Sequence, residues 1–176
     1  MSWTTKSSKE IYKSNWMTVT EDQVLTSTGK ELTWSVVHKK DFALIIPWDG
    51  NKFTLVGVYR YPIGQFSWEF PQGHMEGDNI FETANEELQE ETGLIADKVE
   101  KLGDFHLANG FLDQKCHTFL ATGLKPGNSN REAGEEDMKI KEVTMKEIEN
   151  MIVEGEIKDG PTITALMLFK FWRREK

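Results

Sequence analysis

Six acidic side chains lie within one short segment that follows a loop of Pro and Gly. They are Asp78, Glu82, Glu86, Glu87, Glu90 and Glu91. If residues 79–92 form a helix with roughly 100° of rotation per residue, Glu87 and Glu91 lie within about 40° of each other. At a buried surface two such carboxylates repel each other unless a cation neutralises them, and Mg²⁺ and Mn²⁺ prefer oxygen ligands. The segment is therefore either a metal site or an ordinary solvated helix face, and this geometry leaves both open.

An apolar stripe indicates which side of this helix is buried. It consists of Ile80, Phe81, Ala84 and Leu88. The stripe must face the core, which places Glu87 and Glu91 at its edge and points Glu82 and Glu86 away from it.

The segment "EFPQG" just before the helix adds a second kind of oxygen donor. Pro71 and Gly73 break the preceding strand, so backbone carbonyls near Gln72 can point at the acidic face of the helix. This arrangement favours the metal site over the solvated face.

The remaining elements form the scaffold that positions these residues. Alternating residues in 15–40 predict a hairpin around "STGK", and "DGNK" separates two further strands, 42–48 and 53–61, which we expect to pair. Strands are also expected at 100–108, 115–124 and 140–145, a polar loop at 125–138, and helices at 145–156 and 160–174. Together they predict an α/β fold with a mixed β-sheet between helical layers.

Composition excludes several classes of protein. The 176 residues fit one globular domain with a substantial core, and a net charge of -8 disfavours binding to a nucleic-acid backbone. The single cysteine, Cys116, excludes an internal disulfide and is expected to be a buried apolar residue. No apolar run approaches the roughly 20 residues of a membrane span. The first residues carry no apolar signal segment, so we expect a cytoplasmic protein that contacts neither nucleic acid nor membrane.

The segment "EELQEETGL" resembles the Nudix box. The residues that match the box are Gly73, Glu87, Leu88, Glu90, Glu91, Gly93 and Leu94. Three features depart from it: Asp78 stands where the family has its first Glu, Glu86 replaces its Arg, and the spacer after Gly73 is one residue short. Because the family's Arg commonly holds a box carboxylate in place, that orienting role has no candidate here, and a different arrangement around the metal is expected.

The resemblance extends over nearly the whole chain and implies the subgroup of ADP-ribose pyrophosphatases and nucleoside diphosphate sugar hydrolases. "VYRYPIGQFSWEFPQG" resembles its strand before the box, and "EGEIKDGPTITALMLFKFW" its terminal helix. The resemblance implies a Nudix fold with an N-terminal β-hairpin exchanged in a homodimer. Residues 1–38 would form the dimer arm and residues 39–176 the hydrolase domain.

The implied reaction is hydrolysis of the pyrophosphate bond of a nucleotide sugar, which yields a nucleoside monophosphate and a sugar phosphate. By resemblance, Glu87 and Glu91 are the main Mg²⁺ ligands, Glu90 and the Gln72 carbonyl assist, and Mn²⁺ can substitute for Mg²⁺. The base that takes the proton of the attacking water is expected in "AGEEDM", at Glu136 in preference to Glu135, with Glu90 as a further candidate.

Substrate recognition requires cations for the phosphates and flat apolar faces for the base. Arg60 matches an arginine that approaches the diphosphate, and its planar group suits that task, although it could instead form a surface ion pair. Trp16 and Trp34 on the hairpin resemble residues that sandwich the adenine, whereas isolated strand tryptophans usually pack in a core. In "HLANGFLDQ", the expected contacts with the sugar end are Asn109, Gly110, Phe111 and Asp113.

Two other functions stay open. One is a Nudix hydrolase for another diphosphate, such as a dinucleoside polyphosphate. The other is a non-catalytic module that senses a nucleotide sugar, which the departures at Asp78 and Glu86 motivate.

Overall fold

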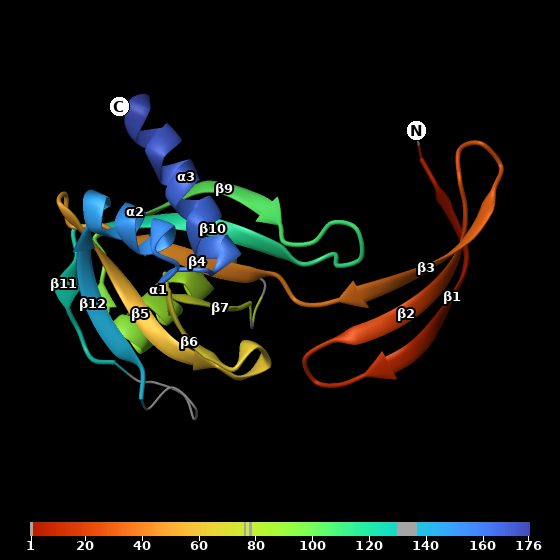
Figure 1. Ribbon diagram of the computed structural model, residues 1–176, viewed down its shortest axis with the longest axis horizontal. Helices are drawn as coiled ribbons and strands as arrows, with labels where there is room; N and C mark the ends of the chain where they lie inside the picture. Colours follow the sequence, from red (N-terminus) through yellow and green to blue (C-terminus); the bar gives the residue numbers. More distant parts are fainter. Residues whose placement is uncertain (1, 76, 78, 130–136) are drawn as a thin grey trace. The chain divides into compact units, whose positions relative to one another are not determined.

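The computed structural model describes residues 2–75, 77, 79–129 and 137–176 (Figure 1). They form two compact units. One comprises Met1–Asp41 together with Phe105–Lys115, and the other comprises Phe42–Asp104 together with Cys116–Lys176.

The N-terminal unit is built on a three-stranded antiparallel sheet. Its strands, in the spatial order β1-β2-β3, are β1 (Thr4–Lys13), β2 (Thr18–Leu25) and β3 (Glu31–His38). The predicted hairpin is confirmed as β2 and β3, with a turn in which the Thr26 N–H donates to the Lys30 carbonyl at 2.8 Å. Gly29 supplies the positive φ, 80°, that this turn requires.

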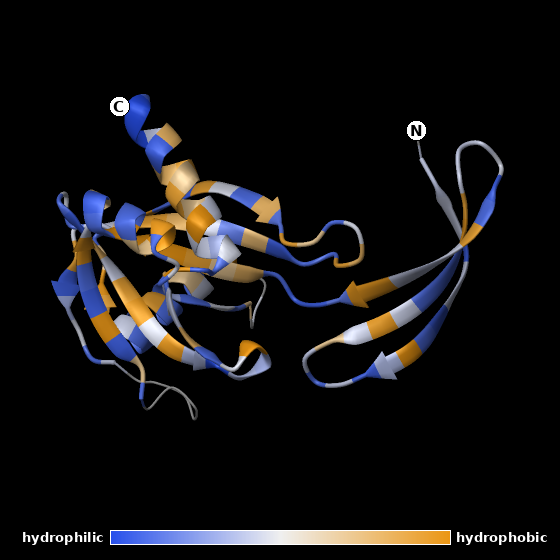
Figure 2. Ribbon diagram, viewed as in Figure 1, coloured by the Kyte–Doolittle hydropathy of each residue, from blue (hydrophilic) through white to orange (hydrophobic). Residues whose placement is uncertain are grey.

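Sequence patterning did not single out β1 as a strand of its own. All ten of its residues are exposed, so it lacks the apolar alternation of a strand with one buried face. Figure 2 shows this contrast between the largely hydrophilic β1 and the hydrophobic segments of β4 and β5 in the other unit.

The second unit contains two larger sheets. The mixed one has the order β7-β4-β10-β9, with β10 parallel to β4, and is formed by β4 (Phe42–Pro47), β7 (Gln72–His74), β9 (Lys98–His106) and β10 (Lys115–Thr122). The antiparallel one has the order β12-β5-β6 and is formed by β5 (Lys52–Arg60), β6 (Gln65–Glu69) and β12 (Lys139–Thr144). A short pair joins β8 (Leu94–Ile95) to β11 (Lys125–Pro126), and a 3-10 turn, η1 (Tyr61–Ile63), links β5 to β6.

The expected pairing of the strands around "DGNK" is wrong. β4 and β5 belong to different sheets, and only Trp48, the residue after β4, forms an isolated bridge with Phe53 of β5. All six residues of β4 are buried because the strand is covered on both faces and pairs instead with β10 and β7.

The helices of the described residues are α1 (Ile80–Thr92), α2 (Met145–Val153) and α3 (Gly160–Arg174). On one face of β4, Ala43 and Ile45 pack with Ala84 and Leu88 of α1. Leu44 and Ile46 point to the opposite face, and Figure 1 shows α1 and α3 on different sides of β4. The predicted layering of helix, mixed sheet and helix is therefore confirmed.

Two smaller predictions concern single side chains. Phe81 is not fully part of the buried stripe: it is 44% exposed and meets Phe119 edge-on at 4.9 Å. Cys116 is fully buried as expected, and burial raises the pKa of its thiol to about 12, which keeps the thiol protonated near neutral pH. Over the described ranges no helix is both long and apolar enough to cross a bilayer.

Candidate active site

Glu87 and Glu91 of α1 both face β7. The backbone N–H of Gln72 donates to Oε2 of Glu91 at 3.0 Å, and Glu91 is 3% exposed. The Glu87 carboxyl group lies over the Cα of Gly73, so closely that a Cβ on Gly73 would overlap it. Glu82 and Glu86 are exposed, as the helical geometry predicted. The acidic face of α1 is therefore seated on the "PQG" backbone, and the solvated-face alternative is excluded for Glu91.

Because Gly73 has no side chain, the Glu87 carboxyl group can lie directly over it. Gly73→Ala is expected to leave the free energy of unfolding nearly unchanged, because the flexible end of Glu87 can swing away. If Glu87 is a Mg²⁺ ligand, displacing its carboxylate should raise the Mg²⁺ concentration for half-maximal activity about tenfold. Metal titrations of activity, run with the control Gly77→Ala, check this, since a Cβ at Gly77 has no atom within 4 Å. Equal metal requirements in the two variants would contradict a role of Glu87 in metal binding.

An ion pair between a buried carboxylate, Glu69, and a partly exposed guanidinium, Arg60, lies beside this acidic face. Glu69, at the end of β6, is 2% exposed and accepts from the Arg60 guanidinium, at 3.1 Å from Nε to each oxygen and 2.5 Å from Nη2. The Gln72 side-chain amide also donates to Glu69, at 2.6 Å. Burial alone would lower the pKa of Arg60, but its bonds to Glu69 and the charges of Glu69, Glu91 and Asp159 raise it above the ordinary value.

The start of α3 reaches the same region. Asp159 caps this helix by accepting from the Thr162 N–H at 2.8 Å, and the Thr162 hydroxyl accepts from the Phe70 N–H at 3.0 Å. Burial, followed by the charge of Glu69, raises the pKa of the Asp159 carboxyl above its ordinary value. The N-terminus of α3 is thereby fixed to the chain between β6 and β7.

The donor atoms suit a hard divalent cation in kind. Glu87 and Glu91 present carboxylate oxygens one helical turn apart, next to the backbone of Gln72 and Gly73. Within the described ranges, no three His, Cys, Asp or Glu side chains are already grouped as a complete metal site. The two carboxylates therefore fit part of a metal site.

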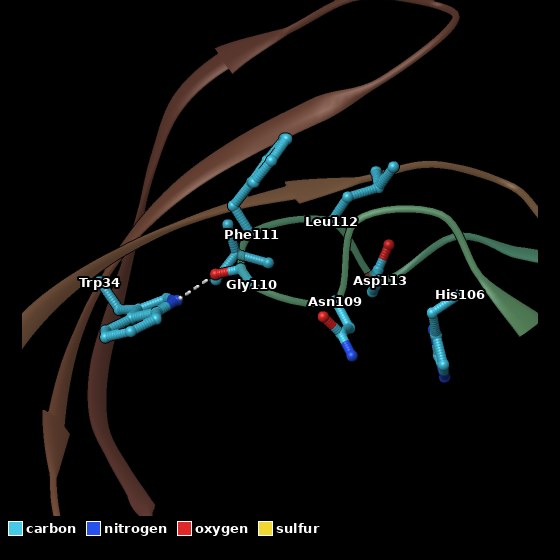
Figure 3. Close-up of a pocket in the computed structure, with 8 residues that line it drawn as sticks. Trp34, His106, Asn109, Gly110, Phe111, Leu112 and Asp113 are labelled. Atoms are coloured by element: carbon cyan, nitrogen blue, oxygen red, sulfur yellow. Dashed lines mark hydrogen bonds between the residues drawn. The ribbon is translucent and has the colours of Figure 1, made fainter. Parts of the chain in front are cut away.

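In the N-terminal unit, an open pocket of about 310 Å³ brings together five of the predicted substrate contacts (Figure 3). Its lining consists of Trp34, Val36, His106, Asn109, Gly110, Phe111, Leu112 and Asp113. Its volume is at the lower end of the roughly 300–1,000 Å³ usual for ligand sites. A flat indole and a half-exposed Phe111 flank polar groups, which suits a planar ring with a polar substituent.

The loop that forms this pocket is tied to β3. The Trp34 indole N–H donates to the Gly110 carbonyl at 3.0 Å, as Figure 3 shows, and the Val37 N–H donates to the Phe111 carbonyl at 2.7 Å. Asp113 lies 2.6 Å from Nδ1 of His38 and accepts from the Lys39 N–H. The Asp113 carboxylate thus already holds the loop in place.

Other predicted site residues lie elsewhere. Trp16 is 74% exposed and is not part of the pocket lining, whereas Glu90 is partly buried on α1. The candidate bases Glu135 and Glu136, and Asp78 of the box, lie outside the described residues.

Several residues of these sites were missed by sequence reasoning. Glu69 gave a signal, since it is an isolated charge in the strand-like "FSWEF" just before Pro71. Asp159 also gave one, as a helix cap two residues before Pro161. His106 also gave one, since it opens the segment "HLANGFLDQ" that forms the pocket loop, whereas His38 gave none, because it meets that loop only through the tertiary fold.

Comparison with known proteins assigns the family. The NUDIX domain model matches residues 38–166. The chain belongs to the Nudix family. The model of the nucleoside diphosphate sugar hydrolase N-terminal domain matches residues 3–37 of this Nudix protein. The predicted Nudix fold and class of enzyme, a Nudix hydrolase, are therefore confirmed.

Individual proteins agree with this assignment. The Nudix chain is 29% identical to an ADP-ribose pyrophosphatase of Bacillus subtilis, over 90% of this chain and 87% of that protein. It is 30% identical to an ADP-ribose pyrophosphatase of Mycobacterium tuberculosis, over 93% of this chain and 81% of that protein. A crystal structure of an ADP compounds hydrolase superposes with a TM-score of 0.88 and 19% identity, over 99% of this chain and 96% of that one, and supports the fold.

Proposed function

We propose that this Nudix protein hydrolyses the pyrophosphate bond of a nucleoside diphosphate sugar such as ADP-ribose, with Mg²⁺ as its cofactor. The observation that carries the proposal is the seating of Glu87 and Glu91 on the backbone of Gln72 and Gly73. The match of residues 3–37 to a nucleoside diphosphate sugar hydrolase domain supports the substrate class. The products are a nucleoside monophosphate and a sugar phosphate.

Cleavage of a P–O–P bond between two anionic phosphates has three requirements. The negative charge must be neutralised, a water must lose a proton, and that water must be held in line with the leaving oxygen. Bound Mg²⁺ supplies charge neutralisation, and Glu87, Glu91, Glu90 and the Gln72 carbonyl would hold it. Glu136 is the proposed proton acceptor, with Glu135 and Glu90 as alternatives.

The pocket of the N-terminal unit is the proposed site for the nucleoside. Trp34 and Phe111 supply apolar faces for a base, and Asn109 supplies an amide that can bond a polar substituent. Gly110 and Asp113 shape this site through their bonds to Trp34 and His38. Trp16 remains a proposed contact for the base, and a direct contact of Arg60 with the diphosphate is the alternative to a positioning role for that residue.

Turnover of ADP-ribose with and without Mg²⁺ tests the proposal. We expect release of AMP and ribose 5-phosphate, loss of activity in EDTA, and recovery with Mg²⁺ or Mn²⁺. Binding of ADP-ribose without turnover would point to the sensing module. Faster turnover of a dinucleoside polyphosphate than of ADP-ribose or GDP-mannose would point to the other hydrolase class.

We also propose that the N-terminal unit mediates a homodimer, with residues 1–38 as the arm and residues 39–176 as the hydrolase domain. Large apolar side chains exposed on or next to β1 and β2 support this, since a partner chain would cover them. They are Trp3, Ile11, Tyr12, Trp16 and Met17.

Light scattering of the intact chain is expected to give twice the 20.2 kDa mass of one chain. If the arms complete each other's sites, mixing inactive Trp34→Ala and Glu91→Gln chains should restore activity, because one site of the mixed dimer keeps both residues. A monomer mass would contradict the dimer, and a dimer whose mixed form stays inactive would contradict shared sites.

A further inference from the structure

Arg60, Glu69 and Gln72 form a continuous set of hydrogen bonds that ends on a carboxylate of the box. Arg60 holds both oxygens of Glu69, and Glu69 holds the side-chain amide of Gln72. The backbone N–H of the same Gln72 then donates to Glu91 at 3.0 Å. Glu69 and Glu91 are therefore linked through hydrogen bonds to one residue, Gln72.

Burial makes this arrangement sensitive to charge. Glu69 and Glu91 are 2% and 3% exposed, and carboxylates buried to that degree need a compensating cation or several hydrogen bonds. Asp159 adds a third acidic group, and Arg60 experiences the charges of all three. The guanidinium is well suited to this position because its planar geometry matches a carboxylate at two points.

The box, residues 73–94, contains no Lys or Arg for this purpose. At the position where the Nudix box carries Arg, the chain has Glu86, whose side chain is exposed and acidic. The orienting role of that missing arginine must therefore fall to a residue from another element, or be lost.

We propose that Arg60 is a positioning residue that takes over this role from outside the box, by fixing Glu69 and, through Gln72, the orientation of Glu91. This proposal rests on the proposed function for its kinetic readout, but not for its metal-binding readout. It differs from the expected role of Arg60 as a diphosphate contact, in which the guanidinium would act on the substrate directly.

Four variants separate the two roles: Arg60→Lys, Arg60→Met, Glu69→Gln and the double variant Arg60→Met/Glu69→Gln. Lys52→Met is the matched control, since Lys52 is also on β5 but forms an exposed pair with Glu142. The measurements are thermal unfolding, Mn²⁺ affinity by electron paramagnetic resonance without substrate, and kcat and KM for ADP-ribose.

If Arg60 positions Glu91, Arg60→Met and Glu69→Gln each lower kcat and Mn²⁺ affinity about tenfold or more, while KM changes by less than about threefold. The double variant should then lose no more kcat and Mn²⁺ affinity than the more impaired of the two single variants, because both residues act through one set of bonds. Lys52→Met should match the wild type.

Two results would overturn the proposal. One is a large rise in KM with unchanged kcat and Mn²⁺ affinity in the Arg60 variants, which would make Arg60 a substrate contact. The other is a double variant whose losses are the product of the single losses, which would show that the two residues act independently.

Removing the cation that pairs with a buried carboxylate can unfold a protein, so Arg60→Met can fail to fold. Arg60→Lys, which keeps the charge but not the planar group, and the double variant, which removes both charges, then decide the question by the same split between kcat and KM. If the wild type does not turn over ADP-ribose, the proposed function fails, whereas the Mn²⁺ affinities still decide the role of Arg60.

Discussion

Glu91→Gln is expected to lower kcat/KM for ADP-ribose by about 100-fold, a loss of about 3 kcal/mol of transition-state stabilisation. In this variant the backbone N–H of Gln72 can still donate to the side-chain oxygen at position 91, so this hydrogen bond is kept. The variant loses one of two adjacent negative charges, which weakens metal binding directly. Steady-state kinetics at several Mg²⁺ concentrations measure the effect.

The matched control for Glu91→Gln is Glu86→Gln, which makes the same chemical change on the exposed side of α1. It should retain wild-type kinetics and stability, because an exposed carboxylate on a helix contributes little. Equal activity of the two variants at limiting Mg²⁺ would show that the metal is held elsewhere.

Glu136→Gln is expected to lower kcat by about 100-fold or more with little change in KM, as loss of a general base does. The reason is that a proton acceptor acts mainly in the transition state, whereas a metal ligand also acts in the ground state. Added Mg²⁺ should partly rescue Glu87→Gln but not Glu136→Gln. Curves of kcat against Mg²⁺ concentration for both variants make the comparison.

The neighbouring carboxylate provides the control for this second experiment. Glu135→Gln alone should have a small effect, and the double variant should resemble Glu136→Gln. If Glu136→Gln and the double variant both keep the wild-type kcat, the segment "AGEEDM" does not carry the base. A box carboxylate such as Glu90 would then be the better candidate.

The buried face of α1 could be predicted from sequence because side chains repeat along a helix about every 3.6 residues. The spacing of Ala84 and Leu88 fixed the buried side, and that alone placed Glu87 and Glu91 at its edge, as the structure confirms. The range of α3 was predicted as 160–174 and is observed as such, whereas the cap residues Asn79 and Asp159 were not singled out.

Long-range partners could not be predicted in this way. A short turn between β4 and β5 indicates a hairpin, yet β4 finds a parallel partner in β10, more than 60 residues further along the chain. The same limit applies to Arg60, whose partner Glu69 lies across a hairpin. Nothing in the sequence around Arg60 shows that its guanidinium is turned toward a buried carboxylate.

The exposed strand β1 has a consequence for the behaviour of the protein in solution. In the sheet order β1-β2-β3 it is an outer strand, and such a strand can recruit other chains by backbone pairing. Lys6, Lys9, Glu10 and Lys13 place charges along it, and its register with β2 shifts at Thr5/Ser7 and at Glu10/Tyr12. Charges and irregular register both oppose indiscriminate strand addition, so β1 is protected against aggregation even where no partner covers it.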